Sequence, residues 1–325
     1  MLEEQIIKRL SRKSELSYTF NYSKEVLLTV EEFEDFIVET EDNLNGFIKT
    51  EKDLPILNNI KPYSDFEPLK FNPVSGPIFI NGAEKGDLII LRIKKIIPSE
   101  TGYTYLRPGL GNLSESSKWP ELRENYTKIF KHIPGPSGTT SDGKAIYNDK
   151  ISWNLAPLIG TIGVCPDFEI HSSLVGQFPC GGNWDCRDIK EGSKLILNCY
   201  HKGALLYLGD VHGSQGDTEW TGVANEVKAE VILSCEIIKN KKIPYARIEK
   251  EESIIQLFAD KPLEDAVHQA MVNLMDWMVK DFSVKPRDAY ILISTVPDFR
   301  INIYQMIRNP LFKYVVGAEF PKKYL

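Results

Sequence analysis

The chain has 325 residues, 42% of them hydrophobic and 26% charged, with a formal net charge of -6. This length suffices for one large domain or two, and the composition is typical of a folded globular protein rather than a disordered one. The negative charge gives no electrostatic basis for binding nucleic acid or an anionic membrane, so we expect neither as a partner.

The N-terminal segment and the cysteines bear on the compartment. Residues 1–15 mix charged and apolar side chains, which predicts a short N-terminal helical extension and not a signal peptide. No apolar run approaches the ~20 residues that span a bilayer. The five cysteines include no C-x-x-C pair, which predicts free thiols in a reducing compartment. We therefore expect a cytoplasmic protein.

Residues 16–260 have the pattern of strands joined by turns and predict a β-rich, β-sandwich-like catalytic core. Predicted strands lie at 16–22, 25–30, 35–39, 88–97, 151–164, 194–200, 204–208, 227–238 and 245–249. Residues 101–145 are rich in Gly, Pro, Ser and Thr and show little periodicity, so they predict a long loop excursion. Such a segment usually forms a lid, a binding loop or a contact with a partner subunit.

The last part of the chain, residues 261–325, changes character. Apolar side chains recur at helical spacing from Leu263 to Met278, after Pro262 at a permitted first-turn position, and predict a core-facing helix. Residues 287–296 then resemble a strand and residues 299–308 a second helix. The predicted fold class is mixed α and β, predominantly β, with a C-terminal helix–strand–helix portion packed on the core.

Acidic residues gather where predicted strands begin or end. Asp42 follows the strand at 35–39, Asp185 ends a Gly-Gly-Asn-Trp-Asp cluster, and a glycine-rich acidic stretch spans 209–219. Carboxylates and a histidine are ligands for a divalent metal, and they are also the acids and bases of hydrolysis. One β-sandwich can bring all three turns to a common end. The alternative is that these residues only shape solvated turns, which suits Asp210 better than a ligand role.

Four motifs, in this order and spacing, make the chain resemble the acetamidase/formamidase family, in its shorter, acetamidase-like branch. They are GPIFINGAEKGDLI (76–89), LIGTIGVCP (158–166), GGNWD (181–185) and GALLYLGDVHGSQGDTE (203–219). The resemblance implies a hydrolase that converts short aliphatic amides, such as formamide or acetamide, to the carboxylate and ammonia. It also implies a bound divalent metal, zinc in the first place and calcium as the alternative. Edge strands and the 101–145 excursion favour a homodimer or a higher homo-oligomer.

The same resemblance implies the site residues, to which we assign individual roles. The predicted metal ligands are Asp42, Asp185, His212 and Glu226. The predicted catalytic residues are Glu219 as the base, Asp217, and Asn183 as a donor to the oxyanion. The predicted substrate contacts are Trp184, Gln215 and Thr218. Thr218 stands where the family pattern Gly-Asp-Gly-Glu has glycine, and this departure bears on the choice of substrate.

Other classes of function remain as alternatives. A protein of the same fold could bind a small carboxamide or a structural ion without hydrolysing it, and a lyase or ring-opening hydrolase could use the same site. The complete set of carboxylates and histidine favours the enzyme. Amidases with a serine or cysteine nucleophile fit less well, because we identify no Gly/Ser-rich segment of the kind that leads into a Ser-Ser-Lys arrangement, and Cys165 and Cys199 lie in or beside predicted strands instead of at a strand-to-helix elbow.

Overall fold

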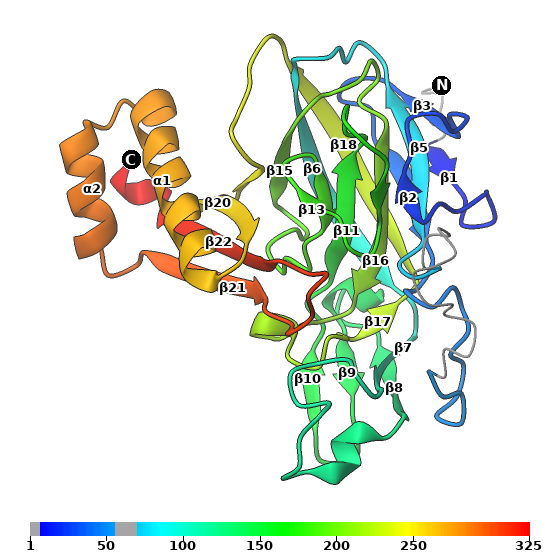
Figure 1. Cartoon of the computed structure of the whole chain (residues 1–325). Helices are drawn as coiled ribbons and strands as arrows, with labels where there is room; N and C mark the ends of the chain where they lie inside the picture. The colour runs from blue at the N-terminus through cyan, green and yellow to red at the C-terminus, as the bar shows by residue number, and fades with distance from the viewer. Residues whose placement is uncertain (1–6, 56–69) are drawn as a thin grey trace.

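The computed structural model of the chain describes residues 7–55 and 70–325, and strands dominate it (Figure 1). Within these residues the strands form a nine-stranded sheet, an eleven-stranded sheet and a two-stranded pair. Helices α1, Leu263–Phe282, and α2, Pro286–Thr295, lie side by side near the C-terminus. The predicted class, mixed α and β with β predominant, is confirmed.

The first sheet has the order β1-β4-β18-β6-β15-β19-β20-β22-β21. Its neighbours are antiparallel except for β1 and β4, which run parallel. The strands are β1 Lys8–Leu10, β4 Phe36–Thr40, β6 Leu88–Pro98, β15 Lys194–Asn198, β18 Ala229–Ile238, β19 Arg247–Glu249, β20 Ser253–Asp260, β21 Arg300–Gln305 and β22 Tyr314–Pro321.

The second sheet has the order β10-β9-β8-β7-β17-β16-β11-β14-β13, and β5 joins it by pairing with both β16 and β3. The strands are β3 Leu28–Val30, β5 Val74–Ile80, β7 Thr101–Leu106, β8 Tyr126–Ile133, β9 Lys144–Ile146, β10 Ser152–Asn154, β11 Leu158–Val164, β13 Gln177–Phe178, β14 Gly181–Asn183, β16 Leu206–His212 and β17 Glu226–Val227. The pair is β2 Thr19–Phe20 with β12 His171–Ser172.

The two large sheets share one apolar core. Side chains of β4, β6 and β18 in the first sheet pack in the same cluster as side chains of β5, β11 and β16 in the second. Because each buried strand turns one face toward the opposite sheet, this packing produces the sandwich that the strand pattern predicts. Strand β11, in which all seven residues are buried, is covered on both sides and is apolar except for Thr161.

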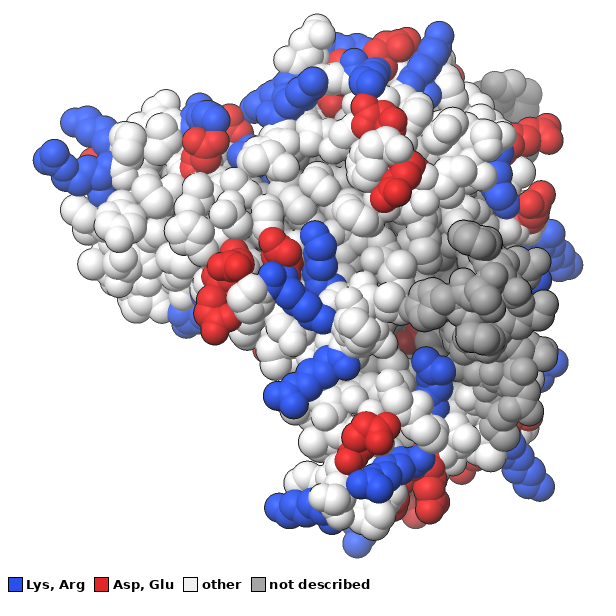
Figure 2. Space-filling model, viewed as in Figure 1, with Lys and Arg blue, Asp and Glu red and all other residues white. Residues whose placement is uncertain are grey.

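A second apolar core joins the helices to the end of the first sheet. Ala270, Leu274 and Met278 of α1 are buried against Val316 and Phe320 of β22. These residues recur at helical spacing, so the predicted helix after Pro262 is confirmed. No helix in the described part of the chain has both the length and the apolar composition needed to cross a membrane. Basic and acidic side chains are interspersed on the face shown in Figure 2.

The predicted N-terminal helix is wrong for the residues that the structure describes. Residues 8–10 form β1 and pair in parallel with β4, and residues 1–6 lie outside the described part. A helix of about this length is marginal in water by itself. Pairing with β4 instead satisfies the backbone and buries Leu10 in the core between the sheets.

The predicted loop excursion over residues 101–145 is also wrong, because β7, β8 and β9 lie within it and extend the second sheet. Tyr103 and Tyr105 alternate with more exposed residues along β7, and both are buried. The Gly, Pro, Ser and Thr residues that masked this pattern lie mostly between the strands. Only the connections at 107–125 and 134–143 are irregular for most of their length.

The order of the C-terminal elements differs from the prediction. Residues 286–295 form helix α2 instead of a strand, and residues 300–305 form strand β21 instead of a helix. Pro286 at the first helical position starts α2, and Ala289 and Ile293, four residues apart, face the second core. β21 pairs with β22, so this portion continues the first sheet.

Substitutions at Ile293 and Ile291 test the assignment of α2. Ile293 is 4% exposed and Ile291 50% exposed, because residues two apart point to different sides of a helix, whereas in a strand they share a face. We expect Ile293→Ala to lower the free energy of unfolding by about 2–5 kcal/mol, and Ile291→Ala to change it by about 0.5 kcal/mol or less. Urea denaturation followed by circular dichroism measures both. Equal destabilisation by the two variants would contradict the helix.

Candidate active site

The site lies at the end of β16, where the sheet brings distant residues together. Asp210 and His212 belong to β16, and Glu226 of β17 is paired directly with His212 across the sheet. Asp185 follows β14, which is separated from β16 by β11. Because directly paired residues have adjacent side chains, the strand register places Glu226 beside His212. Glu219 comes from the short 3-10 helix Asp217–Glu219, between β16 and β17.

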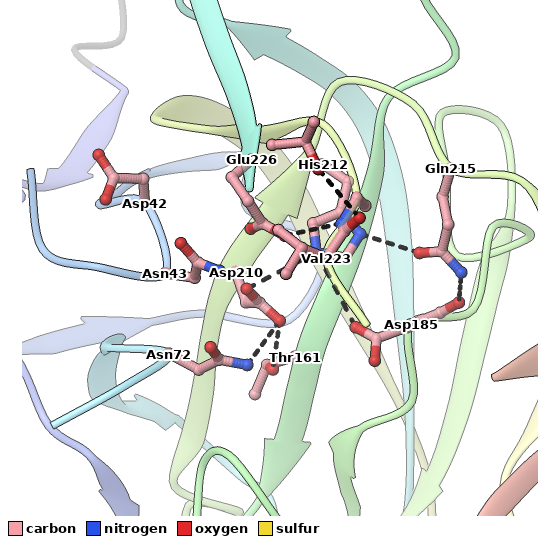
Figure 3. Close-up of polar contacts among 12 residues, drawn as sticks. Asp42, Asn43, Asn72, Thr161, Asp185, Asp210, His212, Gln215, Val223 and Glu226 are labelled. Carbon is pink, nitrogen blue, oxygen red and sulfur yellow. Dashed lines mark hydrogen bonds and ion pairs between the residues drawn. The ribbon is translucent and has the colours of Figure 1, made fainter. Parts of the chain in front are cut away.

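Carboxylate oxygens surround one nitrogen of the imidazole (Figure 3). His212 Nε2 lies 3.5 Å from Glu226 Oε1, 3.6 Å from Asp210 Oδ1 and 3.9 Å from Asp185 Oδ1. Two overlapping sets of three side chains have ligand atoms within 4.8 Å of one another. They are Asp185, His212 and Glu219, and Asp210, His212 and Glu226. Each set can hold a metal ion.

Gln215 fixes the orientation of the imidazole. Its Nε2 donates hydrogen bonds to the backbone oxygens of Asp185, at 2.6 Å, and Tyr304, at 3.1 Å. Its Oε1 is therefore the atom that lies 2.9 Å from His212 Nδ1, and an amide oxygen can only accept. His212 Nδ1 must carry the proton of that bond, so Nε2 faces the carboxylates with a lone pair or a second proton.

Neutral donors hold three of the four carboxyl groups. Asp210 Oδ2 accepts from Asn72 Nδ2 at 2.8 Å and from Thr161 Oγ1 at 3.2 Å. Asp185 Oδ2 accepts from Gln305 Nε2, and Glu226 Oε1 accepts from the backbone N–H of Ala224 at 3.1 Å. In Asp210 and Asp185 these bonds leave Oδ1 directed at His212, whereas in Glu226 the same Oε1 accepts from Ala224 and lies next to His212. A carboxyl oxygen of Glu219 lies within 4.8 Å of ligand atoms of Asp185 and His212.

Burial and mutual repulsion make these acids hard to ionise together. Burial, followed by the nearby charge of Asp210, raises the pKa of Asp185 to about 7. Burial likewise raises the pKa values of Glu219 and Glu226 well above the usual value. Burial opposes the charge of His212, but Glu226, Asp210 and Asp185 outweigh it and raise its pKa well above the usual value. Carboxyl groups packed so closely need protons or a cation among them.

The backbone of the site is strained at the residues that carry the carboxyl groups. Asp185, Asp210 and Glu219 have φ values of 45°, 52° and 46°. Residues other than glycine seldom adopt this left-handed region, and such strain is concentrated at functional sites. The positive φ of Asp210 also corrects our view of it as a residue of a solvated turn, since it lies buried within β16.

The donor set fits a divalent cation. Glu226 Oε2 is buried and has no hydrogen-bond partner among the described residues. A Cβ atom at Gly160 would fall 2.8 Å from Asp185 Oδ1 and 2.9 Å from Asp210 Oδ2, so the glycine leaves room between these oxygens. Oxygen ligands together with one imidazole are accepted by zinc, and carboxylates are also ligands for calcium.

The structure places Asp42 outside both sets of ligand atoms. Its Oδ1 accepts from the backbone N–H groups of Leu44, at 3.1 Å, and Gly46, at 2.9 Å, and from Tyr103 Oη at 2.8 Å. This is the hydrogen-bonding pattern by which an aspartate stabilises its own turn. Of the three acidic turns expected to meet at one cation, only those of Asp185 and His212 do so.

Three other predicted residues also lie where their assigned roles fit poorly. Asp217 is exposed and forms an ion pair with Arg187 at 3.0 Å. Trp184 is fully buried in the core between the sheets and so lies away from any substrate. The amide of Asn183 donates to the backbone oxygen of Leu174 at 2.8 Å and accepts from Thr161.

Sequence reasoning overlooked Asn72, Thr161 and Gln305 as residues that hold the carboxyl groups. Thr161 lies within the motif at 158–166, and Asn72 lies four residues before the motif at 76–89, so their neighbourhoods carried a signal. Gln305 carried none, because it lies in a segment predicted to be helical.

Comparison with known proteins identifies the family. A sequence model described as the Acetamidase/Formamidase family matches residues 20–177 and 175–317. The chain belongs to this family. An acetamidase from Yersinia enterocolitica has the same fold, with a TM-score of 0.85 and 30% sequence identity over 99% of this chain and 93% of that one.

Two named proteins are similar to this chain in sequence. A Schizosaccharomyces pombe protein named as a candidate formamidase is 25% identical over 65% of this chain, and an acetamidase of Mycolicibacterium smegmatis is 27% identical over 45% of it. The matched regions span 61% and 48% of those two proteins. The family shared with them agrees with the one that the four motifs imply.

Thr218 offers a test of strain beside the site. Its φ is 72°, a conformation that costs about 1–2 kcal/mol for a residue with a Cβ atom. Thr218→Gly should therefore raise the free energy of unfolding by about 0.5–1 kcal/mol after the entropic cost of glycine. Thr218→Ala is the control, because alanine keeps the Cβ atom and should bring no gain. Chemical denaturation measures both, and a destabilising glycine would show that the strain is absent.

Zinc binding distinguishes Glu226 from Asp42. We expect Glu226→Gln to weaken zinc binding at least about tenfold, because it removes a charged ligand oxygen. Asp42→Asn keeps an oxygen for its three donors and should bind zinc as the unmodified protein does. Competition with a chromogenic chelator measures both affinities. Stronger weakening by the Asp42 variant would restore Asp42 as a ligand.

Proposed function

We propose that the protein is a metal-dependent hydrolase of short aliphatic amides, formamide or acetamide among them, which it converts to the carboxylate and ammonia. The observation that supports this proposal best is the convergence of four buried carboxyl groups on one imidazole, in a member of the acetamidase/formamidase family. The cytoplasmic location and the homo-oligomeric state remain predictions.

In this proposal Asp185, Asp210, His212 and Glu226 hold the cation. Gln215 presents His212 Nε2 to it, Asn72 and Thr161 orient Asp210, and the unpartnered Oε2 of Glu226 gains a partner. When bound, a divalent cation polarises an amide carbonyl and lowers the pKa of a water molecule. The imidazole favours zinc over calcium, which prefers oxygen ligands alone.

Glu219 is the proposed acid and base. Among the described residues no amide, hydroxyl or backbone N–H donates to its carboxyl group, whereas such donors anchor Asp185, Asp210 and Glu226. Glu219 also lies on the connection between β16 and β17, not within a strand. It can therefore take a proton from the attacking water and return it to the departing nitrogen. Its carboxyl group lies within 4.8 Å of ligand atoms of Asp185 and His212, beside the proposed cation site.

A neighbouring cavity is the proposed approach for the substrate. Its volume is about 320 Å³, and it is lined by Thr104, Phe130, Trp153, Ser214, Gln215, Gly216, Val223, Ala224 and Asn225. Gln215 and Ala224 each contact the site from this cavity, through His212 and Glu226. Phe130 and Trp153 pack edge to face at 5.4 Å and supply an apolar wall. The cavity is large enough for a short amide.

Replacement of Glu219 tests the mechanism. We expect Glu219→Gln to fold and to bind zinc while losing about 10²–10⁴-fold in kcat, because the glutamine cannot accept the proton of water. Ammonia release from formamide, acetamide and propionamide measures turnover, and the chelator competition measures zinc. Asp217→Asn, two residues away and exposed, is the matched comparison and should change kcat by about twofold or less.

Three results would contradict parts of this proposal. Unaltered kcat in the Glu219 variant would remove that residue from the reaction. If a chelator removes the metal and ammonia is still released, the cation has no role in the reaction. A protein that binds acetamide and zinc but releases no ammonia from any amide of the panel would instead be the non-catalytic binder.

A further inference from the structure

The C-terminal hairpin of β21 and β22 reaches the site through consecutive residues. Gln305 Nε2 donates to Asp185 Oδ2, and the backbone oxygen of Tyr304 accepts from Gln215. The backbone N–H of Met306 donates to the oxygen of Thr218 at 2.9 Å, beside Glu219. The end of the first sheet thus contacts the segments that carry Asp185, His212 and Glu219.

Gln305 is itself held by a second buried amide. Gln177 Nε2 donates to Gln305 Oε1 at 2.5 Å, and the backbone N–H of Lys313 donates to Gln177 Oε1 at 2.6 Å. Gln177 is 2% exposed and Gln305 0% exposed. Gln177 comes from β13, the last strand in the order of the second sheet, and Gln305 from β21, the last in the order of the first. The amide pair therefore links the ends of the two sheets.

The direction of this hydrogen-bond chain is fixed at its far end. The N–H of Lys313 can only donate, so Gln177 must present its oxygen to it and its NH₂ group to Gln305. Gln305 must then present its oxygen to Gln177 and its NH₂ group to Asp185. If the Gln305 amide were reversed, its oxygen would face the carboxyl oxygen of Asp185 and its NH₂ group would face the NH₂ group of Gln177. Both contacts are repulsive, and no water reaches this buried position to pair with the groups.

We propose that Gln305, locked by Gln177, is a positioning residue for the cation site and for the proposed hydrolysis. It holds Asp185 Oδ2 as an acceptor and so aims Oδ1 at His212 Nε2, 3.9 Å away, and at the space that Gly160 leaves open. Glu219, the proposed base, has a carboxyl oxygen within 4.8 Å of the ligand atom of Asp185. The part of this inference that concerns turnover rests on the proposed function, whereas the part that concerns cation binding does not.

Methionine variants test the pair, because methionine has nearly the length of glutamine but neither donates nor accepts strongly. We expect Gln305→Met to weaken zinc binding about 10–100-fold, as loss of a partner that orients a ligand does. With saturating zinc, kcat should fall at least about tenfold while KM changes less than about threefold, since a displaced Asp185 disturbs the cation and the neighbouring Glu219 without touching the substrate cavity. Gln177 touches no proposed ligand, so Gln177→Met should weaken zinc binding and lower kcat in the same direction but less. We expect the logarithm of each fold-change to be about a third of that for Gln305→Met.

Gln256→Met is the matched control. Gln256 is also a fully buried amide, but it donates to the backbone of Tyr245, Ala246 and Leu257, away from the site. Its replacement should lower the melting temperature and leave zinc affinity and kcat unchanged. A merely structural role of Gln305 would produce the same result as this control. Zinc affinity is measured by chelator competition on the full chain, and kcat and KM by ammonia release.

The outcomes separate this inference from the proposed function. The inference is overturned if the Gln305 and Gln177 variants both keep the zinc affinity and the kcat of the unmodified protein, even if the protein hydrolyses amides. Weakened zinc binding in a protein that hydrolyses no amide would support the positioning role and overturn the function. If Gln305→Met fails to fold, Gln177→Met decides, because unchanged zinc affinity there would show that the locked amide is not needed.

Discussion

The structure depends on the cost of burying four carboxyl groups around one imidazole. Asp185, Asp210, Glu219 and Glu226 are all buried, and unpaired charges are expensive in such an environment. The protein meets this cost with hydrogen-bond donors for three of the four and with His212. What remains is an excess of negative charge and an unpartnered oxygen, which is the environment that a divalent cation stabilises.

This constraint explains why the site needs both sheets. Strands β16 and β17 supply Asp210, His212 and Glu226, while β21, at the end of the first sheet, supplies the donor for Asp185. Helices α1 and α2 share one apolar core with β20, β22 and β21, against which Ile301 and Ile303 of β21 pack. The C-terminal portion is therefore part of the site, in keeping with a structural likeness to the Yersinia enterocolitica protein that covers 99% of the chain.

The predicted site residues that the structure brings together and those that it does not differ in where their side chains point, not in residue type. His212, Glu219 and Glu226 were found because they lie in or near one motif, where the change from an apolar strand to polar residues is visible in the sequence. Asp42 and Asp217 have equally suitable side chains, but one stabilises its own turn and the other faces solvent. Only the direction of each side chain separates these cases, and residue type does not determine that direction.

The sequence by itself determined the β-rich class, the long helix α1 and the motifs of the family, because strand and helix periodicity and turn residues act locally. Only the tertiary structure decided that residues 286–295 are helical and 300–305 extended, since short apolar runs suit either state until packing selects one. It also decided that Asn72, Thr161 and Gln305 hold the carboxyl groups. Those contacts join residues 138, 49 and 120 positions apart, and no local pattern records such distant partners.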